Sequence, residues 1–328
     1  MKRARNSAMA LSAGAVALAV TLSGCMTVHG ETAVVPATSE KEARKVFREF
    51  TAKSNRANSR LDTRLNATIE GGALGAINQA ALKTRKGAKE NGEKIPPIPP
   101  LKLRDTRFLI PKQAGWPKFF VADTRGDDTG NRWFYVFQRE SVDARWKASY
   151  LSVLEPDELP TFPKDSDGHV KAVPSGGGSG LSVAPGALSR EYVRTLRDGG
   201  DRFADGPHTD KRRTQRERSE KRPGLRTEFA DSAARPPQFV PAGLRVKGGG
   251  ALVFFASHHH TKQTFHKDYA PKIKDPLVRE MLSGETPKKA VTYARVSQQA
   301  VSVPEADSAG DGVVFLNRID GMTSAKAD

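Results

Sequence analysis

Residues 132–139, Arg-Trp-Phe-Tyr-Val-Phe-Gln-Arg, decide the fold class of this chain. Side chains alternate between the two faces of a strand, and in residues 133–137 both faces are apolar and rich in aromatic residues. A strand of this kind is buried on both sides. We therefore expect helices on one face of its sheet and further structure on the other.

Three neighbouring segments have the same character. Residues 102–111, 118–123 and 145–154 are rich in Phe, Trp, Tyr, Val and Leu, and turn-forming sequences separate them. They predict strands that join residues 132–139, most simply as an antiparallel meander.

Helices are predicted before these strands. Ser39 and Glu42 stand three residues apart, which predicts a capping box. Apolar residues then recur at three- and four-residue spacing, as in an amphipathic helix over about 40–57. The spacing continues to Gly71-Gly72, which should stop or kink the helix, and residues 74–82 predict another short helix.

The second half repeats the order of helices followed by strands. Residues 161–186 are rich in Pro and Gly and predict a linker. Residues 209–222 are polar all round, as in a solvated helix or a mobile loop, and Gly248-Gly249-Gly250 predicts a hairpin turn. The predicted helices are 188–198, a short one around Phe229 and 276–282, and the predicted strands are 238–247, 250–266, 289–303 and 312–319.

In both halves, helices come before the strands of an antiparallel sheet. This order resembles that of the nuclear transport factor 2-like (SnoaL-like) cone fold, whose sheet is curved. The sequence therefore predicts an α+β chain with two such domains in tandem, residues 39–160 and 187–328, joined by the linker 161–186. This resemblance concerns the fold, and a fold alone does not assign a function.

The N-terminus has the features of an export signal. Lys2, Arg3 and Arg5 precede an uncharged apolar run, residues 8–22, which is shorter than the roughly 20 residues of a transmembrane helix. Leu22-Ser23-Gly24-Cys25 follows, and it contains the only cysteine of the 328 residues. A plain secretory signal or a permanent membrane span are the alternatives.

These four residues resemble the lipobox of bacterial lipoproteins. The resemblance implies that residues 1–24 are a cleaved signal peptide and that the Cys25 thiol carries a diacylglyceryl group. Residues 25–38 would then be a tether at the extracytoplasmic face of the cell membrane. Two acyl chains give stable anchoring where one gives only marginal binding.

Four further segments resemble an uncharacterised family of actinobacterial lipoproteins. These segments are Leu61–Ala67, Asp105–Phe119, Ala251–His259 and Val314–Arg318. The resemblance covers most of the chain and implies a secreted, lipid-anchored protein. It brings no assigned activity and no catalytic residues.

Histidines provide one candidate site. On a strand His258, His260 and His266 would point to the same face, and a His-x-His pair with a third histidine can bind zinc or copper. Lys262 shares that face and would repel a cation. The alternative is a solvent-facing histidine cluster on a sheet.

Aromatic residues provide a second candidate. Trp133, Tyr135, Trp146 and Tyr150 are concentrated in the first half and would line a cavity if the sheet curves into a cone. The alternative is that they form the core, because aromatic side chains dominate burial.

The net charge of +16 suggests anionic partners. A basic exterior outside the cell attracts lipid headgroups and anionic wall polymers. The run 211–222 contains seven Lys and Arg residues and is either such a contact or a solvated loop. Nucleic acid is a poor candidate, because no recognition motif is present.

Signals for catalysis are missing from the sequence. It has no Gly-x-Ser-x-Gly elbow, no phosphate loop and no pair of acids placed on one face, and its cysteine is assigned to the lipid. We therefore predict a non-enzymatic binding or interaction module of the cell envelope, without a cofactor, whose partner is a protein, a wall polymer or a small ligand. The alternatives are a carrier or enzyme that uses a cone cavity in the first domain, and a metal-binding lipoprotein.

Overall fold

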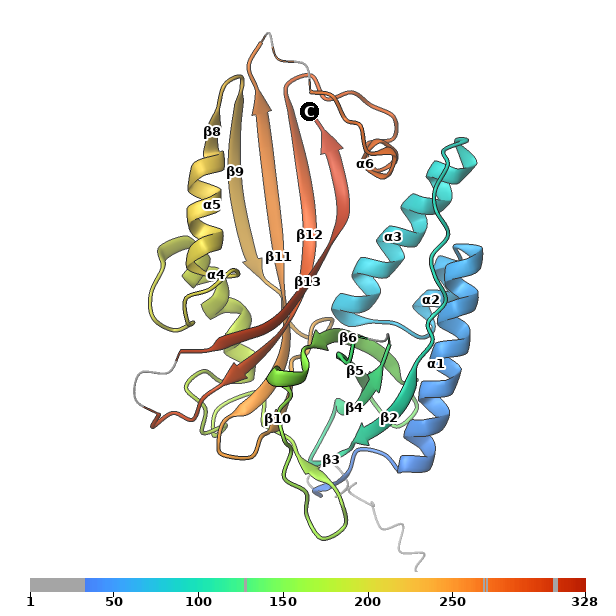
Figure 1. The fold of residues 1–328 in the computed structure, drawn as a ribbon, viewed down its shortest axis with the longest axis vertical. Coiled ribbons are helices and arrows are strands. Elements are labelled where there is room, and N and C mark those ends of the chain that lie inside the picture. Colours follow the sequence, from blue (N-terminus) through green and yellow to red (C-terminus); the bar gives the residue numbers. More distant parts are fainter. Residues whose placement is uncertain (1–32, 127–128, 268, 270, 309–311) are drawn as a thin grey trace, which may run out of the picture.

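The computed structural model describes residues 33–126, 129–267, 269, 271–308 and 312–328. The chain is α+β, as the sequence predicts (Figure 1). No helix of this described part is both long and apolar enough to cross a membrane. The predicted signal peptide and the lipobox residues Leu22, Ser23, Gly24 and Cys25 lie outside the described residues.

The N-terminal half is built on a four-stranded antiparallel sheet. Its elements are α1 (Glu40–Arg60), α2 (Thr63–Ala67), α3 (Gly72–Glu90), β2 (Arg104–Leu109), β4 (Lys118–Arg125), β5 (Arg132–Arg139) and β6 (Lys147–Leu154). The strand order is β2-β4-β5-β6, so the predicted meander is confirmed, interrupted only by the short β3 (Pro111–Gln113).

The two faces of β5 are both buried, as its sequence predicts. On one face Tyr135 and Phe137 pack against Phe47 and Phe50 of α1, with ring centroids 5.2–6.3 Å apart. On the other face Phe134 belongs to a core that reaches into the C-terminal half. This central strand therefore joins two layers of packing.

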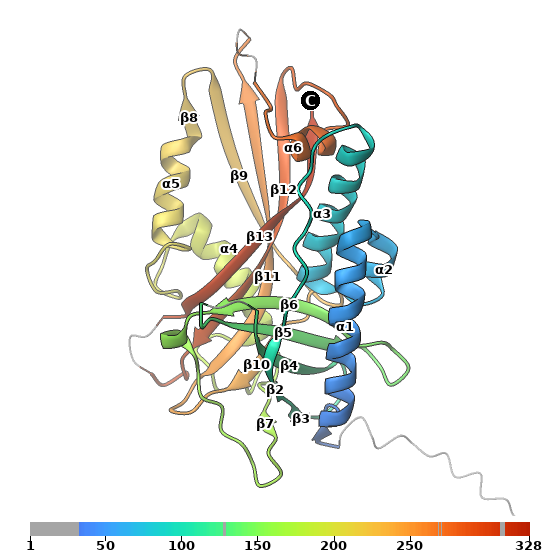
Figure 2. The same cartoon turned by 45° about the vertical axis from the view of Figure 1, so that its right-hand side comes forward.

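The C-terminal half is built on a six-stranded antiparallel sheet. Its elements are α4 (Leu188–Asp198), α5 (Asp210–Glu220), β8 (Lys221–Arg222), β9 (Leu225–Ala233), β10 (Ala242–Arg245), β11 (Ala251–Phe265), α6 (Pro276–Met281), β12 (Ala290–Val303) and β13 (Val314–Ala327). The strand order is β13-β12-β11-β9-β8, and β10 pairs with β11. Helices α4 and α5 cover one face, and the N-terminal half packs on the other (Figures 1 and 2).

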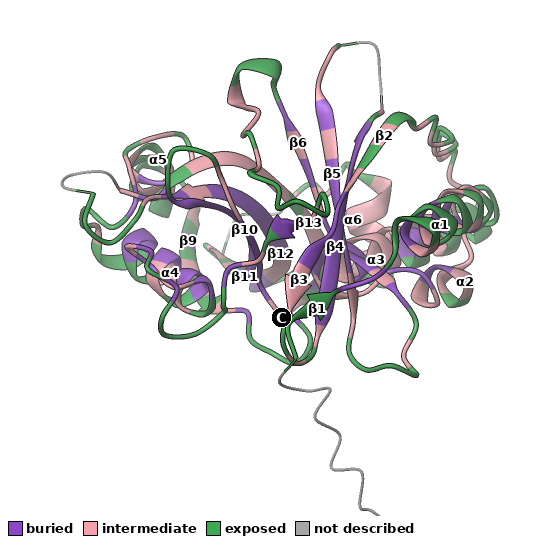
Figure 3. Ribbon diagram, turned by 90° about the horizontal axis from the view of Figure 1, so that it is seen from below, coloured by how far each residue is buried: buried purple, intermediate pink, exposed green. Residues whose placement is uncertain are grey.

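The two halves share one hydrophobic core. Phe134 and Tyr150 of the smaller sheet lie in the same buried cluster as Phe254 and Val296 of the larger one. A polar contact crosses the same junction: Gln298 Oε1 accepts a hydrogen bond of 2.9 Å from the backbone N–H of Leu151. Buried residues concentrate on the strands, and many exposed ones lie on the loops (Figure 3). The division into domains at residues 161–186 stays a prediction.

A small three-stranded sheet holds the start of the described chain. It has the order β1-β3-β7, with β1 at Val35–Pro36 and β7 at Val170–Lys171. Ala37 and Thr38 are buried. The extended segment predicted as tether therefore becomes part of the fold at Val35, three residues before the predicted end of the tether.

The start of α1 differs in one detail from the predicted capping box. Ser39 Oγ accepts from the backbone N–H of Glu42 at 3.1 Å, as predicted. The Glu42 carboxylate, however, accepts from Thr38 Oγ1 at 2.6 Å and from Trp146 Nε1 at 2.9 Å. A long-range contact replaces the local one, because Trp146 is buried against this end of the helix.

Three element predictions are corrected. Phe229 lies in β9 and not in a helix, and β9 pairs with β11 over nine residues. The helix predicted over 74–82 extends to Glu90, and β13 extends to Ala327 rather than 319. For the basic run the sequence allowed either a solvated helix or a loop, and residues 210–220 form the helix. Gly248-Gly249-Gly250 forms the turn of the β10–β11 hairpin, as predicted, and all three glycines have positive φ angles.

Candidate ligand-binding cavity

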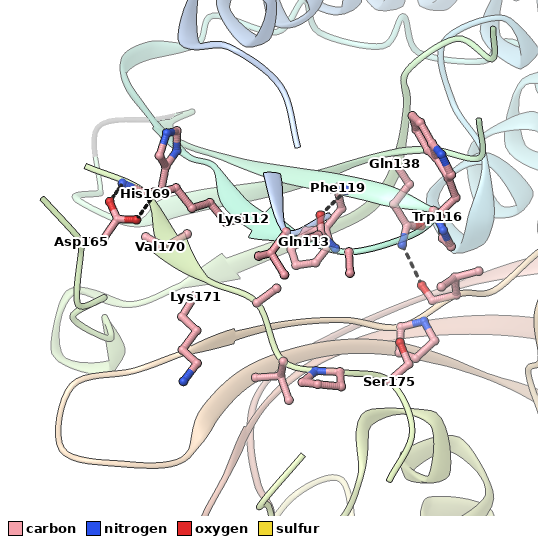
Figure 4. A pocket seen from close by; sticks show the side chains of 18 of the residues that line it. Lys112, Gln113, Trp116, Phe119, Gln138, Asp165, His169, Val170, Lys171 and Ser175 are labelled. Atoms are coloured by element: carbon pink, nitrogen blue, oxygen red, sulfur yellow. Dashed lines mark hydrogen bonds and ion pairs between the residues drawn. The ribbon is translucent and has the colours of Figure 1, made fainter. Parts of the chain in front are cut away.

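A cavity of about 720 Å³ lies between the small sheet and the loop that precedes β10 (Figure 4). Its lining is mainly apolar. The residues that line it include Val34, Trp116, Phe119, Val170, Val240 and Pro241. This volume lies in the range of small-molecule sites in proteins, about 300–1,000 Å³.

Hydrogen bonds hold the floor of the cavity in place. The backbone N–H of Phe119 donates to Gln113 Oε1 at 2.9 Å, and Gln138 Nε2 donates to the carbonyl of Val240 at 3.0 Å. Tyr150 donates to the same carbonyl, also at 3.0 Å. These bonds use Gln113 Oε1, Gln138 Nε2 and the carbonyl of Val240, and most of the surface that a ligand would meet is apolar.

Charged residues surround one side of the opening. Lys112 Nζ lies 2.7 Å from Asp165 and 2.8 Å from Asp167, which raises the pKa of Lys112. The same lysine and the backbone N–H of His169 lower the pKa of Asp165 to about 2. Lys164 and Lys171 also line the cavity. An apolar cavity with this cationic side suits an amphiphile with an anionic head.

Trp116 forms the other side of the opening. It is 37% exposed, and two cations lie near its ring: Lys118 Nζ at 5.9 Å and Arg139 Cζ at 5.4 Å from the centroid. Lys118 is buried, which lowers its pKa, and its ammonium donates to the carbonyl of Gln113. Val34, which also lines the cavity, is 65% exposed.

The four aromatic residues predicted as possible cavity lining lie elsewhere. Tyr135 and Trp146 are buried in the core beneath α1, and Trp133 packs against that core. Tyr150 is buried in the core shared by the two halves. None of the four lines the 720 Å³ cavity, although Tyr150 helps to position its Val240 wall.

The predicted histidine ligands are not brought together. His258 contacts the ring of Phe239, with centroids 4.9 Å apart, and His260 is exposed on the same face of β11. His266 follows the last residue of β11, so strand alternation no longer directs it. Within the described part of the chain, no three His, Cys, Asp or Glu side chains gather closely enough to hold a metal ion.

His259, which was not among the predicted ligands, makes more specific contacts than His258 and His260. It lies on the opposite face of β11, where Nδ1 is 2.6 Å from Asp231 and Nε2 is 2.7 Å from Ser297 Oγ. Strand alternation already separates His259 from its two neighbours. Asp231 could not be named as its partner, because the sequence predicted a short helix around Phe229 where the structure has β9, the strand next to β11.

Comparisons with known proteins identify the family. The family described as "Domain of unknown function (DUF8094)" matches residues 34–327. The chain belongs to this family. The match begins at Val34, so it spans the cavity and both halves of the fold. No solved structure matches.

Relatives from Streptomyces carry the same general name. An uncharacterized lipoprotein of Streptomyces coelicolor is 40% identical over 97% of this chain and 94% of its own length. Another, of Streptomyces avermitilis, is 39% identical over 97% of this chain and 95% of its own. A second Streptomyces coelicolor lipoprotein is 22% identical over 89% of this chain and 87% of its own. The resemblance to uncharacterised actinobacterial lipoproteins is therefore confirmed.

Proposed function

We propose that this protein is a lipid-anchored, non-enzymatic binding protein of the extracytoplasmic membrane face, and that its cavity takes an amphiphilic ligand. One observation carries the proposal: a mainly apolar cavity of about 720 Å³, with lysines at one side, opens next to Val34. The apolar lining would hold a hydrocarbon portion, and Lys164 and Lys171 would attract an anionic head.

The position of Val34 connects the cavity to the membrane. The relatives are named lipoproteins, and Leu22-Ser23-Gly24-Cys25 resembles a lipobox. Eight residues lie between Cys25 and Val34, and the nine steps from one Cα to the other span at most about 30 Å. An acylated Cys25 would therefore keep the opening of the cavity within reach of the bilayer, where amphiphiles are found.

We propose the tandem SnoaL-like cone as the organisation of the fold. Support comes from the repeated arrangement: α1 covers the outer face of the four-stranded sheet, and α4 and α5 cover the outer face of the six-stranded sheet. In both halves the helices precede most of the strands that they cover.

The test combines native mass spectrometry with a blocked cavity. The full-length protein is extracted from membranes of its own host, and its mass is measured under gentle desolvation. The Ala114→Trp variant places a large side chain at an exposed lining position, and Ala306→Trp makes the same change on an exposed loop away from the cavity. Cleavage before Cys25 and acylation are read from the same spectra.

We expect an acylated mature chain with additional non-covalent mass in the wild type and in Ala306→Trp. The additional mass should fall at least tenfold in abundance in Ala114→Trp. Equal retention by all three proteins would overturn the assignment of the cavity. An unacylated chain would overturn the anchor, whatever else is bound.

A further inference from the structure

The face of the six-stranded sheet beneath α5 is polar and yet buried. Toward α4 this face is apolar, with Phe255, Val301 and Val303 in one cluster with Tyr192. Beyond Phe255 the same alternation gives polar residues, at most 2% exposed: Ser257, His259, Ser297 and Gln299. We refer to these four residues with Asp231 as the polar layer.

Most residues of the polar layer form hydrogen bonds with one another. Arg216 of α5 binds Asp231 through two nitrogens, at 2.5 and 2.9 Å, and His259 Nδ1 lies 2.6 Å from the same carboxylate. His259 Nε2 in turn lies 2.7 Å from Ser297 Oγ. An Asp-His-Ser chain has the connectivity of a hydrolase triad, but Ser297 is fully buried, so no substrate carbonyl reaches it.

Two arginines beside the polar layer have buried hydrogen-bond donors without an acceptor among the described residues. Arg318 on β13 is paired with Gln299 in the sheet, its side chain is 3% exposed, and its Nη1 lies 2.7 Å from Asp320. Its Nε and Nη2 are buried without an acceptor in the described structure, and so is Nε of Arg212 on α5. A buried charged donor without a partner destabilises the folded protein.

A cavity of about 350 Å³ adjoins these groups. Arg212, Arg222 and Arg295 line it, from α5, β8 and β12. No carboxylate of the described residues lies within ion-pair distance of any of these three arginines. The acid in the lining is Asp320, which Arg318 already binds. His259 and Thr261 add neutral polar groups on the floor.

We propose that this second cavity binds a compact oxyanion of the phosphate class, such as a phosphate monoester or diphosphate group. Three arginines from three elements converge on one small space, and guanidinium groups bind phosphate oxygens through paired N–H donors. The anion would accept hydrogen bonds from the arginines that line the cavity, Arg212, Arg222 and Arg295, and its negative charge would also stabilise Arg318 behind Asp320. The site is separate from the apolar cavity at Val34 and does not depend on it.

The experiment uses inorganic pyrophosphate as the probe. Isothermal titration calorimetry on the full chain in detergent, at fixed ionic strength, compares the wild type with Arg212→Gln and Arg218→Gln. Arg218 lies on the same helix but is exposed and lines neither the 720 nor the 350 Å³ cavity, so it controls for net charge. Arg295→Gln serves as a second test from the opposite wall, and circular dichroism confirms that each variant is folded.

We expect saturable one-to-one binding that weakens at least tenfold in Arg212→Gln and in Arg295→Gln and changes less than twofold in Arg218→Gln. A wild type that binds no pyrophosphate, or variants that bind it equally, would overturn the site. A second experiment measures co-sedimentation of the protein with phosphatidylglycerol vesicles. Co-sedimentation that depends on Arg212 would show that the bound phosphate belongs to a lipid headgroup. Binding of pyrophosphate without binding of vesicles would show that the ligand is soluble.

Discussion

Two buried arginines, one in each half of the molecule, have opposite surroundings. Arg132 on β5 and Arg318 on β13 have side chains 2% and 3% exposed. Arg132 donates from Nε to Asp123 at 2.5 Å, from Nη1 to Asp105 at 2.6 Å, and from Nη2 to two backbone carbonyls. Arg318 has one partner, Asp320, and two nitrogens without an acceptor among the described residues.

The difference indicates what each arginine is for. A guanidinium whose donors are all used, like that of Arg132, fixes the positions of its neighbours, here the ends of β2, β4 and β5. A guanidinium that is buried with unused donors retains the capacity to bind another anion, at the expense of stability. The second arrangement is the one expected at a binding site.

Arg132→Met should show the largest effect. It leaves Asp123 buried without its main partner, and breaking a buried pair in this way destabilises a protein by about 3–5 kcal/mol. Urea unfolding followed by circular dichroism gives the free energy of unfolding. Arg107→Met is the matched control, because Arg107 contacts the same carboxylate at 3.8 Å but is 66% exposed. It should change stability by less than about 1 kcal/mol, and equal losses would contradict the comparison.

The protonation of His259 gives the second prediction. Burial, together with Arg318 and Arg212, lowers the pKa of His259 to about 4, although Asp231 opposes the shift. The unfolded chain binds a proton near pH 6.5 and the folded chain only near pH 4, so stability falls as the pH decreases through this window. The full difference is about 3 kcal/mol by linkage.

His259→Gln removes this titration while keeping a polar side chain against Asp231. Unfolding free energies measured from pH 7.5 to 4 should fall less steeply in His259→Gln than in the wild type. His260→Gln is the control, because His260 is exposed on the other face of β11. If the stabilities of the wild type and of His259→Gln decline in parallel, the polar layer does not hold His259 neutral.

Periodicity predicted the packed elements well. The meander, the helix at 188–198 and the long strands β11 and β12 all have dense apolar alternation or three- and four-residue spacing. The predictions failed where polar residues occupy regular structure. In β9, most of whose residues are polar, exposed positions alternate with buried or partly buried ones, and only the pairing with β11 shows that Phe229 is on a strand.

Neither candidate site has a local signature. The apolar cavity is assembled from three separated segments, the short strands β3 and β7 and the loop at Val240, none of which carries a periodic pattern. The anion site needs Arg212, Arg222 and Arg295, which come from α5, β8 and β12 and are far apart in the sequence. The basic run at 211–222 was visible in the sequence. The sequence could not show which of these side chains face the sheet. Only the orientation of α5 in the structure shows that Arg212 and Arg216 do and that Arg218 does not.

Arg318→Met should show the smallest effect and is the sharpest test of the comparison. The substitution removes the unsatisfied donors, which offsets the lost pair with Asp320, and Asp320 is 33% exposed and stays hydrated. We expect the free energy of unfolding, measured without phosphate, to change by less than about 1 kcal/mol. Arg226→Met, at a side chain 70% exposed, sets the background for charge removal. A loss as large as that of Arg132→Met would mean that Arg318 stabilises the fold as Arg132 does. A small loss of unfolding free energy would mean that Arg318 adds little to stability, which favours ligand binding as the reason for burying an arginine with unpaired donors.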